Sequence, residues 1–222
     1  MAVDEALWSA LKPDDAPIVC LHDFDAESVT LGHSQSPDDL VGTGLEHLPT
    51  AKRPTGGGAI HHHDGMVSFS LIAFDAGGAK RPGPIACRMG TFLVALWRRL
   101  GVEARVVSES EAATHGAPMC SDRQCAGDVL ACGSGLKIAG IGQRHRRGRL
   151  LVQAAVLLDR VGSRAPLRTA APHRDSLQRA VGEVFGAELK QMPLPAMNVD
   201  HIIPVTSGGA PSRIGPKWSS CR

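Results

Sequence analysis

The chain has 222 residues and a mass of 23.4 kDa, and 43% of its residues are hydrophobic, which is enough to bury the core of a globular protein. Its formal net charge of +2 indicates neither nucleic acid nor an anionic membrane as a partner. With 4% aromatic residues and no tyrosine, the chain is poorly suited to form a base-stacking surface. No apolar stretch approaches the roughly 20 residues needed to cross a membrane, so a soluble protein is expected.

The N-terminus argues against export. Asp4 and Glu5 stand where a secretory signal carries positive charge followed by an apolar run. A cytoplasmic location is therefore expected. In that location the six cysteines are expected to be reduced thiols, metal ligands or a nucleophile rather than a disulfide framework.

The first half of the chain alternates short apolar segments with turn residues. Apolar residues at helical spacing predict a helix over residues 2–11, which Pro13 ends. Strands are expected at residues 18–21, 28–31 and 67–71. A glycine loop, Gly56 to Gly58, leads into a further short strand before the last of these.

The second half contains one clear amphipathic helix, over residues 85–100. A strand is expected to follow it at residues 102–107. Two apolar stretches, residues 137–141 and 150–158, then flank a polar segment and predict a hairpin. The tip of this hairpin is basic, from Arg144 to Arg149.

Strands and helices mix without regular alternation, which predicts an α+β fold of mixed, mainly antiparallel sheets packed with helices. No internal repeat or linker interrupts the chain. We therefore expect a single domain over residues 1–206, whose last helix lies at about 174–186. Residues 207–222 are rich in Gly, Ser and Pro and are expected to form a flexible tail.

The three consecutive glycines at 56–58 allow the backbone to approach a ligand closely, with its amides facing a carbonyl or phosphate oxygen. A flexible surface turn is the alternative interpretation. Apolar Ile60, which follows closely, favours a loop that is anchored in a sheet.

Two clusters contain metal-ligand residue types, but neither has the spacing of a metal site. Of the three consecutive histidines, only His61 and His63 would share a strand face. Cys120, Cys125 and Cys132 are separated by four and six residues, unlike the tight cysteine pairs of zinc sites. No metal site is predicted. One of these cysteines could be a nucleophile, and a small buried apolar residue is the alternative.

Lys137 lies between Gly135 and Gly140 at the start of a predicted strand. Its ammonium could point into a pocket against a carboxylate, carbonyl or phosphate oxygen, or it could be a solvated lysine at a sheet edge. The basic tip at Arg144 to Arg149 could hold phosphates, contact an acidic protein or simply be solvated.

In order and spacing, these segments resemble the lipoate-protein ligase and octanoyltransferase family, from the first helix to about Asp159. Residues 52–60, with His62 and Asp64, are similar to the family's arginine, triple-glycine and histidine signature. Residues 135–144 resemble its second signature, which contains a glycine, a lysine, an isoleucine and a glutamine. The resemblance implies a biotin/lipoate ligase catalytic-domain fold. It also implies an enzyme that moves an octanoyl or lipoyl group onto a lysine of a carrier protein.

The resemblance also implies roles for individual residues. Lys137 stands where the family has the lysine that contacts the acyl carbonyl and, in ligases, the adenylate phosphate. The residues implied to bind the substrate are Arg53, Thr55, Gly56, Gly57, Gly58, Ala59, His62, Gly140 and Gln143.

The octanoyltransferase branch carries a nucleophilic cysteine eight residues before the acidic residue of a short strand. Cys120 stands at that offset from Asp128, and Cys125 is the alternative. The sequence departs from the family's usual pattern after the hairpin, where residues 152–155 replace a histidine, a glycine and a serine. It also has Gly142 where an alanine is usual.

The leading hypothesis is acyl transfer without a cofactor. Cys120 attacks the thioester of an octanoyl-acyl-carrier protein, and Lys137 with the glycine-loop amides stabilises the oxyanion. A lysine of a lipoyl domain or of a glycine-cleavage carrier protein then receives the acyl group. An ATP-dependent lipoate ligase, which would need ATP and Mg, is the alternative in the same fold. A non-catalytic module that recognises a carrier or nucleic acid is a third possibility, and no membrane partner is expected.

Overall fold

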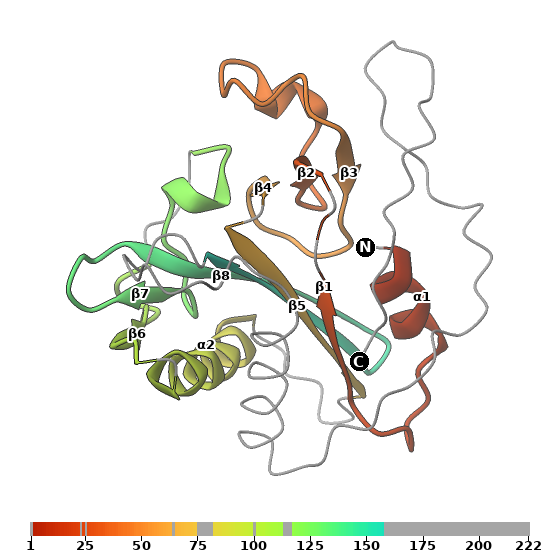
Figure 1. Cartoon of the computed structure of the whole chain (residues 1–222). Helices are drawn as coiled ribbons and strands as arrows, with labels where there is room; N and C mark the ends of the chain where they lie inside the picture. The colour runs from red at the N-terminus through yellow and green to blue at the C-terminus, as the bar shows by residue number, and fades with distance from the viewer. Residues whose placement is uncertain are drawn as a thin grey trace.

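The computed structural model describes residues 2–22, 24, 26–63, 65–74, 82–99, 101–112 and 117–157. These residues form a six-stranded sheet, a three-stranded sheet and two helices (Figure 1). The large sheet runs, in spatial order, through β1 (Ile18–His22), β5 (Met66–Phe74), β9 (Arg149–Leu157), β8 (Lys137–Arg146), β7 (Val129–Ala131) and β6 (Ala104–Val106). All neighbours in it are antiparallel.

The small sheet holds the residues around the glycine loop. Its order is β3 (Thr50–Lys52), β2 (Ser28–Leu31) and β4 (Ile60–His62), with β2 parallel to β3 and antiparallel to β4. The 3-10 turns η1 (Pro37–Leu40) and η2 (Cys120–Asp122) lie in the connections. An isolated bridge between Ala59 and Met119 joins the end of the glycine loop to the start of η2.

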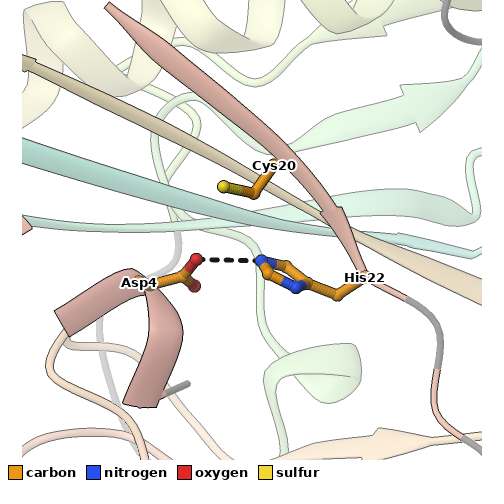
Figure 2. Close-up of side chains that lie close together, drawn as sticks. All are labelled: Asp4, Cys20 and His22. Atoms are coloured by element: carbon orange, nitrogen blue, oxygen red, sulfur yellow. Dashed lines mark hydrogen bonds and ion pairs between the residues drawn. The ribbon is translucent and has the colours of Figure 1, made fainter. Parts of the chain in front are cut away.

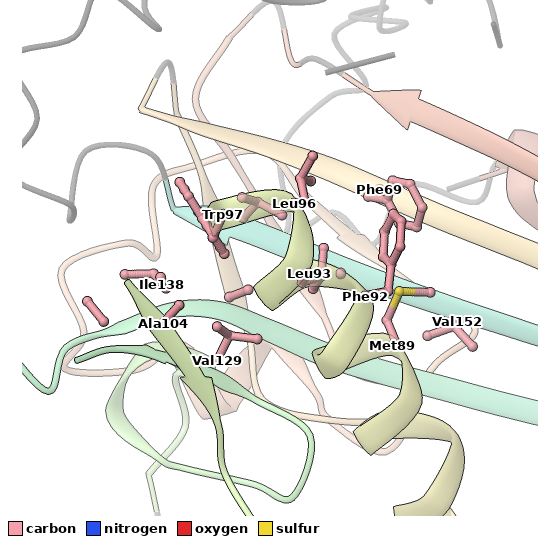
Figure 3. Close-up of a cluster of buried hydrophobic side chains, with 14 of the residues drawn as sticks. Phe69, Met89, Phe92, Leu93, Leu96, Trp97, Ala104, Val129, Ile138 and Val152 are labelled. Atoms are coloured by element: carbon pink, nitrogen blue, oxygen red, sulfur yellow. The ribbon is translucent and has the colours of Figure 1, made fainter. Parts of the chain in front are cut away.

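The two helices lie on opposite sides of the large sheet. The helix α2 (Pro82–Arg99) packs on one face with a cluster of buried apolar side chains (Figure 3). Leu93 and Trp97 are fully buried there, against strand residues that include Phe69 and Val152. The helix α1 (Ala2–Ala10) covers β5 and β9 from the other side, where Val3, Leu7 and Trp8 form a smaller cluster with Ile72.

A polar row crosses the face that α1 covers. Cys20 pairs with Ser70, Ser70 with Gln153, and Gln153 with Gly142, so these residues lie side by side on β1, β5, β9 and β8. Side chains of directly paired residues point to the same face of a sheet. The register therefore places a line of small and polar residues beneath α1 and the glycine loop.

The predicted α+β class is confirmed, and most predicted elements lie within a few residues of the observed ones. The predicted hairpin is confirmed, but its basic tip is shorter than the predicted Arg144 to Arg149. The basic segment after Gln143 is largely strand, because β8 continues to Arg146 and only Arg147 and Gly148 form the turn. Both turn residues have positive φ, at 52° and 78°. Arginines at strand positions satisfy their backbone in the ladder, and here the Arg144 and Arg149 side chains donate to the carbonyls of Pro54 and Leu11, which a composition argument does not detect.

The strand β3 and the turn η1 were not predicted, because they lie in a connector rich in Pro, Asp and Gly. The last predicted helix, at 174–186, and the predicted tail, at 207–222, lie outside the described residues. Within the part of the chain that the structure describes, no helix is long and apolar enough to cross a membrane.

Candidate functional site

The glycine loop is held from inside by Arg53. Its guanidinium, on a residue that is only 3% exposed, donates from Nη1 to the Thr30 carbonyl at 2.9 Å. From Nη2 it donates to the carbonyls of Gly56 and Gly58, at 2.8 and 2.7 Å. The loop carbonyls therefore turn toward Arg53. Burial, together with the nearby positive charge of Arg123, lowers the pKa of Arg53 to about 10, although Cys120 acts in the opposite direction.

The amides of the loop are left open by this arrangement. Among the described residues, no acceptor receives a hydrogen bond from the amides of Gly56, Gly57 or Gly58. Backbone carbonyls drawn to one side leave the N–H groups on the other, where they can bind an oxygen atom that carries negative charge. The loop thus has the arrangement that the sequence predicted for a ligand-binding loop.

Close backbone approaches fix the position of the loop. Gly57 has a φ of 102°, and a Cβ atom on Gly32 would collide with the Gly57 carbonyl. A Cβ atom on Gly142 would lie 2.8 Å from the Gly56 oxygen and 3.0 Å from Thr55 Oγ1. Only glycine at these positions lets the loop lie directly on β2 and β8.

The structure brings Cys120 and Lys137 together, although 16 residues separate them in the chain. Lys137 Nζ lies 3.4 Å from Cys120 Sγ and donates to the Cys120 carbonyl at 2.8 Å. It also donates to the Arg123 carbonyl at 3.0 Å and forms an ion pair with Asp128 Oδ2 at 2.6 Å. An ammonium has three hydrogens, and the three oxygen partners use them all. Gly140 leaves the room for this contact, because a Cβ atom there would lie 2.7 Å from the sulfur.

Lys137 keeps its charge although it is 5% exposed. Burial alone would lower the pKa of Lys137, but its electrostatic interactions with Cys120 and with Asp128 outweigh burial and raise it. Asp128 is itself 1% exposed and accepts from the amides of Cys125 and Ile141, at 2.7 and 3.1 Å. The lysine is therefore an oriented cation beside a thiol.

Cys125 has a different environment from Cys120. Burial, together with the nearby carboxylate of Asp128, raises the pKa of the Cys125 thiol. Among the described residues, Cys120 is the cysteine whose sulfur contacts the Lys137 ammonium. Geometry and charge both favour Cys120 over the alternative that the sequence left open.

Two other predicted binding residues lie further from the sulfur. His62 is buried in β4, where its Nε2 pairs with Thr30 Oγ1 at 2.8 Å and its ring stacks on Phe24. Burial and the Arg53 charge lower the pKa of His62 well below its usual range, so the ring is neutral near pH 7. Gln143 holds a buried Oε1 atom with no hydrogen-bond partner among the described residues. Ala59 is fully buried, and its backbone exchanges hydrogen bonds with Pro118 and Cys120, at 2.8 Å each.

Sequence analysis missed a buried polar network behind the loop. Thr55 Oγ1 donates to Gln153 Oε1 at 2.7 Å, and Gln153 Nε2 donates to Asp4 Oδ2 at 2.6 Å. Asp4 also accepts from Ser70 Oγ at 2.7 Å. It pairs with His22 Nε2 at 2.8 Å (Figure 2). Because the carboxylate can only accept, it fixes the orientation of the Gln153 amide, which in turn makes Thr55 the donor. The only signal in the sequence was Gln153 in the segment that departs from the family pattern.

The same network contains a group of metal-ligand types. Asp4, Cys20 and His22 bring ligand atoms within 4.8 Å of one another (Figure 2). Three protein donors already fill the Asp4 carboxylate, and we assign no metal to it. Although burial alone would raise the pKa of Asp4, the charge and hydrogen bond of His22 lower it to about 2. The buried contact between Asp4 and His22 links α1 to the sheet.

A pocket opens on the outer side of the glycine loop. Its volume is about 520 Å³, and its walls include Gln35, Asp39, Gly57, Pro118 and Arg123. These side chains are largely polar. The pocket is therefore suited to the polar part of a ligand more than to a hydrocarbon chain.

Several solved structures that share this fold are described as lipoate protein ligases. A lipoate protein ligase from Thermoplasma acidophilum with bound lipoic acid is 24% identical, with a TM-score of 0.63 over 85% of this chain and 81% of that one. A bipartite lipoate protein ligase studied with its E2 lipoyl domain, from the same organism, is 22% identical, with a TM-score of 0.59 over 85% and 79% of the two chains. A lipoate-protein ligase A bound with ATP is 24% identical, with a TM-score of 0.57 over 85% and 81%. Comparison with curated protein sequences gives no match.

The family model of the lipoyl protein ligase A/B catalytic domain matches residues 1–189. The match includes every site residue described above, from Arg53 to Gln153. With the glycine loop and the lysine in place, the chain belongs to the lipoyl protein ligase A/B catalytic domain family, whose members are enzymes that transfer lipoyl or octanoyl groups.

Proposed function

We propose that this protein transfers an octanoyl or lipoyl group from an acyl-carrier thioester to a lysine of a lipoyl domain, through an acyl-enzyme on Cys120. The observation that carries the proposal is the contact of 3.4 Å between Lys137 Nζ and Cys120 Sγ. A ligase that only binds an adenylate needs no thiol at the lysine. Here the ammonium lies beside a sulfur that would carry negative charge during transfer.

The first step forms the acyl-enzyme. The Cys120 thiol loses its proton to solvent, and the thiolate beside Lys137 attacks the acyl carbon of the thioester. The carbonyl π electrons move to oxygen, where the glycine-loop amides, which have no acceptor among the described residues, can donate hydrogen bonds. The electrons then return, the carrier thiolate leaves, and that thiolate takes a proton from water.

The second step passes the acyl group to the acceptor. The neutral amine of the acceptor lysine attacks the thioester carbon on Cys120, and the Cys120 thiolate leaves. The nitrogen releases its extra proton to water and the Cys120 thiolate takes up one proton from water, so the products are an acylated lysine and an enzyme with its thiol restored. Lys137 keeps its place in both steps because Asp128 and two carbonyls hold it. No cofactor enters this sequence.

The experiment is transfer to a purified lipoyl domain without ATP, read by intact-protein mass spectrometry. We expect octanoyl-acyl-carrier protein to acylate the domain. Cys120→Ala should abolish the transfer, while Cys125→Ala, the matched control, should retain it. Lys137→Ala should lose roughly 100-fold or more, because an oriented charge next to the reacting atoms contributes about 3 kcal/mol.

The ligase alternative predicts the opposite pattern. Acylation would then require ATP, Mg²⁺ and free lipoate, and Cys120→Ala would remain active. That result would replace the transferase proposal with the ligase, in which the glycine loop and Lys137 hold lipoyl-adenylate.

A further inference from the structure

The side chain of Arg123 lies against the glycine loop and has no assigned role. A Cβ atom on Gly58 would collide with Arg123 Nη2 and would lie 2.8 Å from the Cys120 amide nitrogen. The guanidinium is thus next to the loop where the loop meets the proposed nucleophile. It also lines the pocket of about 520 Å³, together with Gly57.

The position of Arg123 is set by its backbone and not by its side chain. Its carbonyl accepts a hydrogen bond from Lys137 Nζ at 3.0 Å, which fixes the chain after η2. Its guanidinium makes no hydrogen bond or ion pair with any residue that the structure describes. Asp122 accepts from its neighbour Ser121 at 2.7 Å, and the Asp39 carboxylate, at the wall of the same pocket, accepts from the Ser36 amide at 3.3 Å. Five N–H donors therefore remain available beside the loop.

The guanidinium groups of Arg53 and Arg123 lie in the same region and carry like charge. Arg53 lies under the loop, bonded only to carbonyls, and the charge of Arg123 is close enough to act on it. Like charges in a partly buried site repel, unless an anion lies between or beside them. The concentration of positive charge matches an oxygen that carries negative charge while the reaction proceeds.

In the described arrangement, Lys137 has no hydrogen available for an oxygen that carries negative charge. Its three hydrogens are taken by the Cys120 and Arg123 carbonyls and by the Asp128 carboxylate. To donate to an acyl oxygen, it would have to give up one of these bonds. Arg123 would give up none.

We propose that Arg123 is a catalytic residue whose guanidinium, with the amides of Gly57 and Gly58, binds the oxyanion that forms when Cys120 attacks the acyl carbon. The charge of Lys137, 3.4 Å from the sulfur, then stabilises the thiolate, while its bonds to the two carbonyls and to Asp128 hold the 120–128 segment in place. This inference rests on the proposed function, and it assigns the charged oxyanion donor to a residue that neither family signature contains. The guanidinium donates only hydrogen bonds, so the electron and proton balance of the two steps is unchanged.

The test is the rate of acyl-enzyme formation in a single turnover. Enzyme in excess is mixed with octanoyl-acyl-carrier protein, quenched, and read as the octanoyl adduct by intact-protein mass spectrometry. Arg123→Gly should react about 100-fold more slowly, as when one oxyanion donor is removed elsewhere. Millimolar guanidinium chloride should restore part of the rate, whereas sodium chloride at equal ionic strength should not. Arg105→Met, which removes an exposed arginine of β6, should react like the wild type.

The outcomes separate this inference from the proposed function. An Arg123→Gly protein that reacts at the wild-type rate overturns the inference and leaves the acyl-cysteine intact. A slow variant that guanidinium does not accelerate assigns Arg123 a structural role and also overturns it. A wild-type protein that forms no adduct overturns both proposals together.

Discussion

The two faces of the large sheet differ in what they contribute. The face under α2 is packed with apolar side chains and contains no group that the proposed chemistry uses. The face under α1 and the glycine loop carries Ser70, Gln153 and the glycines of β8, and each of these contacts a polar group or a backbone atom across the interface. One side of the same strands supplies stability, and the other positions a loop and a thiol.

The alternation of strand residues explains how one segment serves both faces. On β9, Val152 and Ala154 enter the apolar core, while Gln153 between them points to the loop side. A shift of one residue in register would exchange these roles along the whole strand. The two faces should therefore respond differently to substitution.

The largest expected effect is on the α2 face. Leu93→Ala removes a fully buried side chain from the apolar core, which should reduce the free energy of unfolding by about 2–5 kcal/mol. Urea denaturation followed by circular dichroism measures this decrease in the free energy of unfolding. Transfer activity per folded molecule should remain close to that of the wild type. A loss below about 1 kcal/mol would show that this face is not the main source of stability.

On the loop side, the addition of a single methyl group should slow the reaction, in contrast to the loss of stability expected on the α2 face. In Gly140→Ala, the added Cβ would lie 2.7 Å from Cys120 Sγ and 3.2 Å from Lys137 Nζ, so the pair must move apart. A displacement of this size should lower the acylation rate about 100-fold, or about 2.7 kcal/mol. Gly133→Ala is the matched control, because nothing lies within 4 Å of its Cβ position. Equal rates in the two variants would contradict the proposed site.

The polar network should give the loop side a distinct dependence on pH. The pKa of Asp4 falls from 3.8 in the unfolded chain to about 2 in the fold, so its ionised form contributes about 2 kcal/mol of stability above pH 3.8. That contribution is lost as pH falls through about 2. Unfolding measured between pH 5 and 2 should show a shallower decline in Asp4→Asn than in the exposed control Asp14→Asn. Parallel curves for the two variants would show that Asp4 does not contribute to the pH dependence of stability.

The smallest expected effect is at the end of that network. Thr55→Val removes the donor to Gln153 and keeps the shape, which should cost about 1 kcal/mol of stability. It should also loosen the loop and reduce the transfer rate, whereas Thr55→Ser keeps the hydroxyl and should retain both. Thermal unfolding and the transfer assay measure the two effects. If Thr55→Ser loses as much stability and transfer rate as Thr55→Val, the hydrogen bond to Gln153 does not cause either effect.

The sequence predicted the local elements well where the signal is local, and it indicated candidate site residues that the fold brings together. The glycine loop, the helix α2 and the lysine at the start of β8 each follow from residues that are close in the chain. The offset between Cys120 and Asp128 led the sequence analysis to Cys120, whose role as a nucleophile stays a prediction, and the structure adds its contact with the Lys137 ammonium.

What the sequence could not predict depends on register and on long-range contact. The bond from Thr55 to Gln153 spans 98 positions, and the bond from Gln153 to Asp4 spans 149. Neither can be deduced before the strand pairing is known. Similarly, only the described fold shows that the Arg123 guanidinium has no carboxylate partner among the residues that the structure describes.

The central claim, an acyl group carried on Cys120, is tested most directly by a pulse and chase. The enzyme is loaded with octanoyl-acyl-carrier protein in the absence of ATP, separated from the donor, and mapped by peptide mass spectrometry, and a lipoyl domain is then added. The account predicts an octanoyl adduct on Cys120 that disappears as the domain gains the same mass. An enzyme that carries no adduct on Cys120, or an adduct that the lipoyl domain does not remove, would contradict it.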